Sequence, residues 1–247
     1  MSIIAAVRRF AGFSDETFRF LRALARNNRR DWFLDRKHLY EERVRAPMEA
    51  LVGDLGDRLR IIAPEFIAHP KTSIYRIYRD TRFTADKSPY KSHIAAVFPS
   101  RDTGKHRGAG FYVHVSAGEI FAGGGLYRPE ARDLQAVRSK LSTDHRRFRR
   151  LIRAPRFRRM FGELQGEQLR KVPRGFSPDH PAADLLRYTQ FLAGRTLSPE
   201  TAKSPEFLDA TLDTFRALLP ICRFLNDAIL ESRRSLEEGR GGGPAEM

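Results

Sequence analysis

The stretch that most constrains the fold is residues 111–122, which reads as a tight antiparallel hairpin. Apolar and polar side chains alternate along residues 111–116, FYVHVS, and this period of two predicts a strand with one face in the core. Ala117 and Gly118 form a short turn, after which the chain is predicted to return as the partner strand. So short a connection favours antiparallel pairing, because parallel strands need a long crossover.

The predicted fold class is therefore α+β, an antiparallel sheet of about four strands covered by N-terminal and C-terminal helices. The strands are predicted at residues 74–79, 93–98, 111–116 and 119–124. Apolar residues at helical spacing predict N-terminal helices over about 14–26, 30–45 and 47–60. Later elements are predicted as helices over about 129–141, 144–153, 155–161 and 204–229, with a further short strand at 190–193.

The length of 247 residues suits one large domain, and we predict a single α+β domain over residues 1–231. From Ser232 the chain runs to a low-complexity end, GRGGGPAEM, whose composition predicts a disordered tail over residues 232–247. Hydrophobic residues make up 41% of the chain and include 18 phenylalanines, which is sufficient for a substantial core.

The single cysteine, Cys222, excludes an internal disulfide framework and is typical of a reducing cytoplasm. No run of 18 apolar residues is present, so no membrane span is predicted. The apolar patch near the N-terminus is too short for a secretory signal. We therefore expect a cytoplasmic protein.

The segment from Ile74 to His93, IYRIYRDTRFTADKSPYKSH, carries more positive charge than its own acidic residues neutralise. Its five Arg and Lys residues face two Asp residues, a local excess of +3. A charge on a half-buried strand is costly without a partner, so the excess predicts a bound anion. The planar Arg side chain suits a carboxylate or a phosphate. The alternative is that Arg79–Asp80 and Asp86–Lys87 are structural ion pairs that hold a long loop.

These residues predict a polar, cation-rich pocket that binds a small anionic ligand carrying a phosphate or a carboxylate. If the protein is an enzyme, Asp80, His93 and His114 are the groups suited to general acid–base catalysis. The predicted ligand-binding residues are Arg76, Tyr78, Arg79, Arg82, Lys87, Lys91, Tyr112, Gly123, Gly124 and Gly125. The residues leave open whether the protein is an enzyme, which cofactor it uses and its oligomeric state.

The three consecutive glycines are included because they precede a predicted helix. Backbone N–H groups at a helix N-terminus can approach an anion closely when no side chain intervenes. A tight turn or a bulge at a sheet edge explains the glycines equally well.

A metal site is a minor alternative built on two of the same residues. His93, His114 and Asp80 form a two-histidine, one-carboxylate set in composition. Their spacing in the chain is not close, and the neighbouring cations oppose a divalent ion, so no metal is predicted.

The net charge of +15 is concentrated in two blocks. Residues 71–110 carry +6 and residues 128–174 carry +10. Such a polarised field attracts anionic partners at low salt. Residues 146–159 combine many arginines with an apolar side, so the alternative function is nucleic-acid binding through the 128–174 block. The simpler interpretation of that block is a solvated helix face.

Several segments together resemble a bacterial and fungal family called domain of unknown function 2461. They are, in chain order, GFSDETFRFLRALARNNRRDWF, SIYRIYRDTRFTADKSPYKSHIAAVF, GFYVHV, FAGGGLYRPE and KVPRGFSPDHP. The resemblance covers roughly residues 12–230. It implies one domain and a soluble protein, and it supplies no catalytic residue that could be transferred to this chain.

Overall fold

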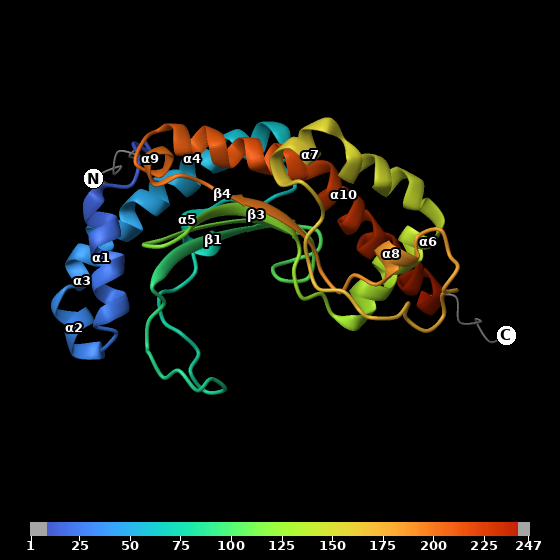
Figure 1. The fold of residues 1–247 in the computed structure, drawn as a ribbon, viewed down its shortest axis with the longest axis horizontal. Coiled ribbons are helices and arrows are strands. Elements are labelled where there is room, and N and C mark those ends of the chain that lie inside the picture. The colour runs from blue at the N-terminus through green and yellow to red at the C-terminus, as the bar shows by residue number, and fades with distance from the viewer. Residues whose placement is uncertain (1–8, 242–247) are drawn as a thin grey trace. The chain divides into compact units, whose positions relative to one another are not determined.

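The computed structural model describes residues 9–241 and confirms the α+β class (Figure 1). The N-terminal part is helical, as its apolar spacing predicts. Its elements are α1 (Asp15–Arg26), α2 (Arg30–Asp35), α3 (Lys37–Tyr40), the π-helical turn η1 (Glu41–Arg45), α4 (Ala46–Ile62) and the short α5 (Pro70–Ser73). Asp15 and Glu16 lie in the first turn of α1, where they oppose the positive end of the helix dipole.

Four strands form the sheet, in the order β1-β2-β3-β4. They are β1 (His93–Pro99), β2 (Gly110–Ser116), β3 (Ile120–Leu126) and β4 (Phe191–Thr196). The hairpin between β2 and β3 closes with a hydrogen bond from the Ser116 N–H to the Glu119 carbonyl, 2.8 Å long. On the other side of β3, the Leu197 N–H donates to the Ile120 carbonyl at 2.8 Å, in keeping with antiparallel pairing.

The remaining elements are mostly helical, and two helices that the sequence separates are joined. They are α6 (Ala131–Arg153), α7 (Pro155–Phe161), α8 (Ala183–Leu186), α9 (Pro199–Ala202) and α10 (Glu206–Gly241). The predicted break near residues 142–143 survives only as a non-helical residue, Asp144, inside α6. Pro220 lies within α10 without ending it.

The predicted strand at 74–79 is wrong as a regular strand, and the fourth strand is β4 instead. Only isolated antiparallel bridges join the segment to the following chain, at Ile74–Ala96 and Tyr78–Tyr90. The Lys91 N–H donates to the Ile77 carbonyl and the Tyr75 N–H to the Ala95 carbonyl. Between these two hydrogen bonds the first segment has a single residue, Arg76, whereas the second segment has three, residues 92–94. The pairing register therefore shifts here, and no continuous ladder forms.

The chain divides into two compact units, and each is described by itself. Unit 1 comprises residues 1–98, 112–122 and 195–215, and unit 2 comprises residues 99–111, 123–194 and 216–247. The single domain over residues 1–231 stays a prediction.

The core of unit 1 is aliphatic and aromatic, and one face of its strands is covered. Phe98 on β1 packs against Phe215 on α10, with ring centroids 5.1 Å apart. Arg195 on β4 donates to the Thr214 hydroxyl and to the Ala210 carbonyl of the same helix. In Figure 1, α4 and the first turns of α10 lie on one side of these strands, and the loop that follows residue 79 extends from the other side.

The core of unit 2 joins α6, β4 and α10 through phenylalanines. The Phe148 ring lies 6.0 Å from Phe191 and 5.0 Å from Phe224. All three side chains are fully buried. The apolar side of the arginine-rich segment therefore faces this core.

Helix α10 continues through residues 232–241, where the sequence predicted a disordered tail. Arg, Leu and Glu in this stretch are good helix formers, and the glycine-rich composition begins only at its end. Arg233 also anchors the stretch, because its guanidinium lies 3.2 Å from the buried Asp133 carboxylate and donates to the Thr103 carbonyl. Residues 242–247 lie outside the described residues.

Within residues 9–241, no helix combines the length and the apolar character needed to cross a membrane.

Candidate functional site

Two histidines lie side by side on the polar face of β1 and β2 in unit 1. His93 is the first residue of β1, and His114 is in the middle of β2. Their ring centroids are 5.6 Å apart. Tyr112 lies edge-on to His114 at 5.6 Å, and Phe121 on β3 stacks against it at 5.7 Å. We call these four residues, with Glu119, the histidine cluster.

Glu119 completes the cluster and holds the His114 ring. Its Oε2 atom lies 3.2 Å from Nε2 of His114. The turn places it there, because the Ser116 hydroxyl accepts the Gly118 and Glu119 N–H groups at 3.2 and 2.8 Å. If Nε2 carries the proton in this bond, the Nδ1 atom of His114 is left as the acceptor.

Glu119 is a site residue that the sequence interpretation missed, although the signal was present. A two-residue turn at 117–118 pairs residue 116 with 119, and therefore 114 with 121. Residue 119 is then the diagonal neighbour of His114 on the same face, within reach of a long side chain. Working out the register of the predicted hairpin would have found both Glu119 and Phe121.

Burial disfavours the protonated form of both histidines. Burial, together with the charges of the nearby His114 and Lys91, lowers the pKa of His93 to about 4. Burial also lowers the pKa of His114, while the Glu119 carboxylate opposes that shift. At neutral pH, His93 therefore presents an uncharged ring with one nitrogen that can accept a hydrogen bond.

The cations of the segment 74–93 are mostly matched to groups of the same segment. The Arg79 guanidinium pairs with Asp86. Arg82 donates from Nε and Nη2 to the two oxygens of Asp80 at 3.0 and 2.8 Å. These pairs differ from the Arg79–Asp80 and Asp86–Lys87 pairs that the sequence suggested.

The two loop lysines also have interactions within the segment. Lys87 donates to the Thr81 carbonyl at 2.9 Å, and the Lys91 ammonium lies 4.9 Å from the centre of the Tyr75 ring. The two carboxylates of the segment pair with Arg79 and Arg82, so the local excess of +3 remains on Arg76, Lys87 and Lys91.

The pKa values of the two loop carboxyls agree with this pairing. Hydrogen bonds from Arg82 lower the pKa of Asp80 to about 2, and hydrogen bonds from Arg79 and Ser88 lower that of Asp86. An aspartate so stabilised as the anion is a poor proton acceptor at neutral pH. The geometry therefore does not favour Asp80 as the general base that the sequence suggested.

The base of this loop is clamped to the N-terminal helices. The Asn28 side chain donates to the Tyr90 carbonyl at 2.8 Å and accepts the Tyr90 N–H at 3.0 Å. The Tyr90 ring stacks on Phe33 at 4.2 Å, and Tyr78 packs against Tyr90 at 5.4 Å. This clamp positions Lys91 and His93, which follow directly.

The predicted site residues therefore fall into separate groups. His93, His114 and Tyr112 come together, with Lys91 close by. Arg79, Asp80, Arg82 and Lys87 serve the loop. Arg76 and Tyr78 are exposed.

The three glycines lie inside strand β3, and their packing explains them. Gly125 has a φ of +123°, and a Cβ atom there would lie 2.0 Å from the Phe191 carbonyl oxygen. At Gly124 a Cβ atom would lie 2.5 Å from the Gly110 carbonyl oxygen. Gly123 is buried. The close approach of neighbouring strands thus requires glycine here, independently of any anion.

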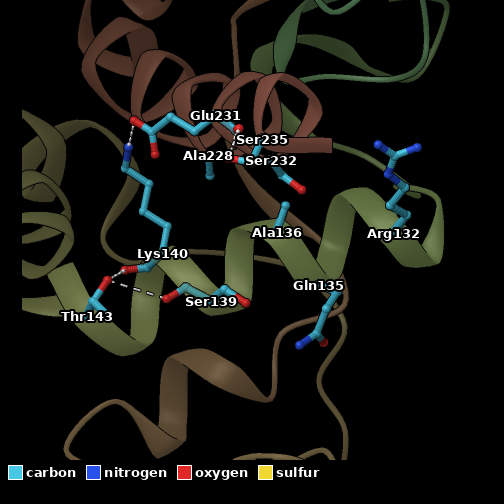
Figure 2. A pocket seen from close by; sticks show the side chains of 10 residues that line it. All are labelled: Arg132, Gln135, Ala136, Ser139, Lys140, Thr143, Ala228, Glu231, Ser232 and Ser235. Atoms are coloured by element: carbon cyan, nitrogen blue, oxygen red, sulfur yellow. Dashed lines mark hydrogen bonds and ion pairs between the residues drawn. The ribbon is translucent and has the colours of Figure 1, made fainter. Parts of the chain in front are cut away.

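A groove of about 430 Å³ lies elsewhere, between α6 and α10 of unit 2 (Figure 2). Lys140 and Glu231 form an ion pair of 2.5 Å beside it, and the Thr143 and Ser235 hydroxyls bond to carbonyls of their own helices. It contains none of the predicted site residues. Its lining is Arg132, Gln135, Ala136, Ser139, Lys140, Thr143, Ala228, Glu231, Ser232 and Ser235.

The part of the chain that the structure describes contains no group of three or more His, Cys, Asp or Glu side chains placed to hold a metal ion. Of the three residues in the alternative metal set, His93 and His114 are adjacent, but Asp80 is bonded to Arg82.

The basic block of unit 2 contains both structural and exposed arginines. Arg138 is buried and donates to the Leu186 and Tyr188 carbonyls. Arg149 bonds to Asp184. By contrast, the residues at positions i, i+4 and i+7 on one face of α6 are exposed; they are Arg146, Arg150 and Arg153.

No curated protein sequence matches the chain. A family model described as "Conserved hypothetical protein (DUF2461)" matches residues 16–224, which is most of the chain and includes the histidine cluster. The chain therefore belongs to the DUF2461 family.

Proposed function

We propose that unit 1 binds a small anion bearing a carboxylate or a phosphate at the histidine cluster, and that the cluster transfers a proton to or from it. The observation that carries the proposal is the neutral His93 ring, 5.6 Å from His114 and close enough to Lys91 for the ammonium to lower its pKa. Perturbed titratable groups that converge on one surface are typical of functional sites.

The roles follow from the chemistry of each group. Lys91 supplies a positive charge for the anion, and its ammonium can donate hydrogen bonds. His93, neutral at physiological pH, is the candidate general base. Glu119 orients His114 and stabilises its protonated form, so His114 is the candidate partner acid. Tyr112 borders the cluster with a hydroxyl that can donate or accept.

The test is a titration with inorganic phosphate and with acetate, followed by NMR at the imidazole signals of His93 and His114. We expect saturable shifts of both signals, weakened about tenfold or more by Lys91→Met, because a charged hydrogen bond contributes roughly 1.5–3 kcal/mol. Lys37→Met, a change at an exposed lysine of α3, is the matched control and should leave the titration unchanged. Shifts that are absent, or equal in the two variants, would refute the proposal.

A second candidate function is nucleic-acid binding through residues 128–174, and one observation favours it. Arg146, Arg150 and Arg153 form an exposed stripe on α6, in a block carrying +10. Phosphate contacts release counterions, so binding should weaken steeply with salt. Replacing the three arginines by glutamate should abolish oligonucleotide binding; affinity that hardly depends on salt would remove this candidate.

We also propose that the protein works in the cytoplasm. The proposal is supported by its single cysteine, Cys222, which is buried and forms no disulfide.

A further inference from the structure

Phe83 is held in solvent at the end of a braced loop. Its side chain is 92% exposed, whereas burial of a phenylalanine would stabilise the fold by about 1.5–3 kcal/mol. We call residues 79–90 the Phe83 loop. In Figure 1 it extends from the strands of unit 1 on the side opposite α4.

The loop is braced along its length by its own side chains. Arg79 pairs with Asp86 across the loop, and the Asp86 carboxylate accepts the Ser88 N–H at 2.9 Å. Lys87 crosses to the Thr81 carbonyl at 2.9 Å. Bracing of this kind reduces the conformational entropy that the loop would lose on binding a partner.

Arg82, the residue before Phe83, is also held by hydrogen bonds within the loop. Asp80 accepts the Arg82 backbone N–H at 3.2 Å and binds its guanidinium with both oxygens. The Arg82 guanidinium lies 5.5 Å from the centre of the Phe83 ring. The loop thus presents an aromatic ring beside a cation, both held by local bonds.

Exposed rings and cations alternate along this part of the chain. Tyr78 is 50% exposed, and Arg76, two residues earlier, is also exposed. Lys87 is exposed beyond Phe83. Basic side chains interleaved with exposed aromatic rings are the arrangement by which proteins bind single-stranded nucleic acids, the rings stacking on bases and the cations contacting phosphates.

We propose that the Phe83 loop is a contact element for single-stranded nucleic acid. Phe83 stacks on a base, Tyr78 offers a second ring, and Arg76 and Lys87 contact the backbone phosphates. The surface belongs to unit 1, and the proposal holds whether or not the histidine cluster binds a small anion.

The carboxylates of the loop favour this partner over a lipid surface. Asp80 and Asp86 have side chains that are 47% and 57% exposed, and both are ionised in their ion pairs. Insertion of Phe83 into a bilayer would bring these charges towards hydrocarbon, where an ionised group is strongly disfavoured. Stacking on a flexible strand leaves both carboxylates in water.

The experiment measures binding of a short fluorescein-labelled oligothymidylate to the full chain by fluorescence anisotropy at low salt. We expect Phe83→Ala to weaken binding roughly 5- to 100-fold, from the usual contribution of base–aromatic stacking. Phe83→Trp should bind at least as tightly as the original chain, and Phe83→Leu should behave as Phe83→Ala because it keeps an apolar side chain without a ring. Ile61→Ala, at an 80% exposed apolar residue of the same unit, should change nothing.

Two outcomes would overturn the proposal. One is equal oligonucleotide affinity of the original chain and Phe83→Ala, with both shown by circular dichroism to be folded. The other is binding to phosphatidylserine-containing vesicles that depends on Phe83 while oligonucleotide binding does not. Anion titration of the histidine cluster is a separate readout, so failure here is distinguishable from failure of the proposed function.

Discussion

His93 begins β1 in surroundings that disfavour its charge, and its pKa should make stability depend on pH. The folded pKa is about 4, against an ordinary value of 6.5, so between these values the unfolded chain binds more protons. The stabilisation is complete above about pH 6.5 and is lost as the pH falls towards 4, by up to about 1.4 kcal/mol per pH unit. The free energy of unfolding, measured with urea at each pH of this range, should depend less on pH in His93→Gln than in the original chain. The control variant His38→Gln, on α3, should show the same pH dependence as the original chain.

Glu119 is the group that keeps His114 from an even lower pKa. Glu119→Gln removes the negative charge and should therefore lower the pKa of the His114 imidazole, as followed by NMR titration. Glu42→Gln, at an exposed position of η1, is the matched control. A His114 pKa that is unchanged or higher in Glu119→Gln would show that the 3.2 Å contact does not act on the ring.

At the scale of the element, β3 depends on glycine where it meets β4. Gly125→Ala should destabilise the protein by at least about 1–3 kcal/mol, because the residue has a positive φ and its Cβ would lie 2.0 Å from a carbonyl oxygen. Gly118→Ala, in the exposed turn with no atom within 4 Å of its Cβ, is the control. Thermal unfolding distinguishes the two variants, and equal melting temperatures would contradict this account.

The end of α10 is a stabilising element in its own right. Arg233→Ala should cost about 3–5 kcal/mol, because it leaves the buried Asp133 carboxylate without its cation. The neighbouring, exposed Arg234→Ala should be nearly neutral. Chemical denaturation measures both, and adding Asp133→Asn to Arg233→Ala should recover part of the loss. No recovery would mean that the lost packing of Arg233, and not the charge, dominates.

At the scale of the whole molecule, the question is whether the chain unfolds as the one domain that its sequence predicts. We expect a single transition, because α10 is one continuous helix whose residues belong to both compact units. Trp32, the only tryptophan, reports on unit 1, while far-UV circular dichroism reports on every helix. Urea curves from the two signals should coincide; separated midpoints would show two domains.

The sequence predicted the fold class and most helices because local signals decide them. Apolar spacing places α1 and α4, and the hairpin of β2 and β3 follows from alternation and a two-residue turn. The role of residues 74–79 depends on the register break opposite residues 92–94, which no local pattern shows. Strand β4 was foreseen only in part, because it lies between a proline-rich loop and α9 and has a short apolar run.

The sequence was sufficient to predict the histidines of the candidate site, but not the partners of its charged side chains. Alternation along β2 put His114 on the polar face, and His93 begins the predicted strand that precedes it. The partners of Arg79 and Lys87 depend on how the Phe83 loop bends, so pairing each with its neighbour in sequence chose the wrong partners. Net charge alone could not reveal that Lys87 would donate to a backbone carbonyl and that Lys91 would lie over the Tyr75 ring.

The clamp of Asn28 on Tyr90 has a consequence for how the chain is assembled during synthesis. The two residues are 62 positions apart, and both emerge from the ribosome before β2 does. N-terminal segments generally fold first on the nascent chain, so α1 and α2 can template the loop and the start of β1 as they appear. The first histidine would then already be oriented when the second emerges from the ribosome.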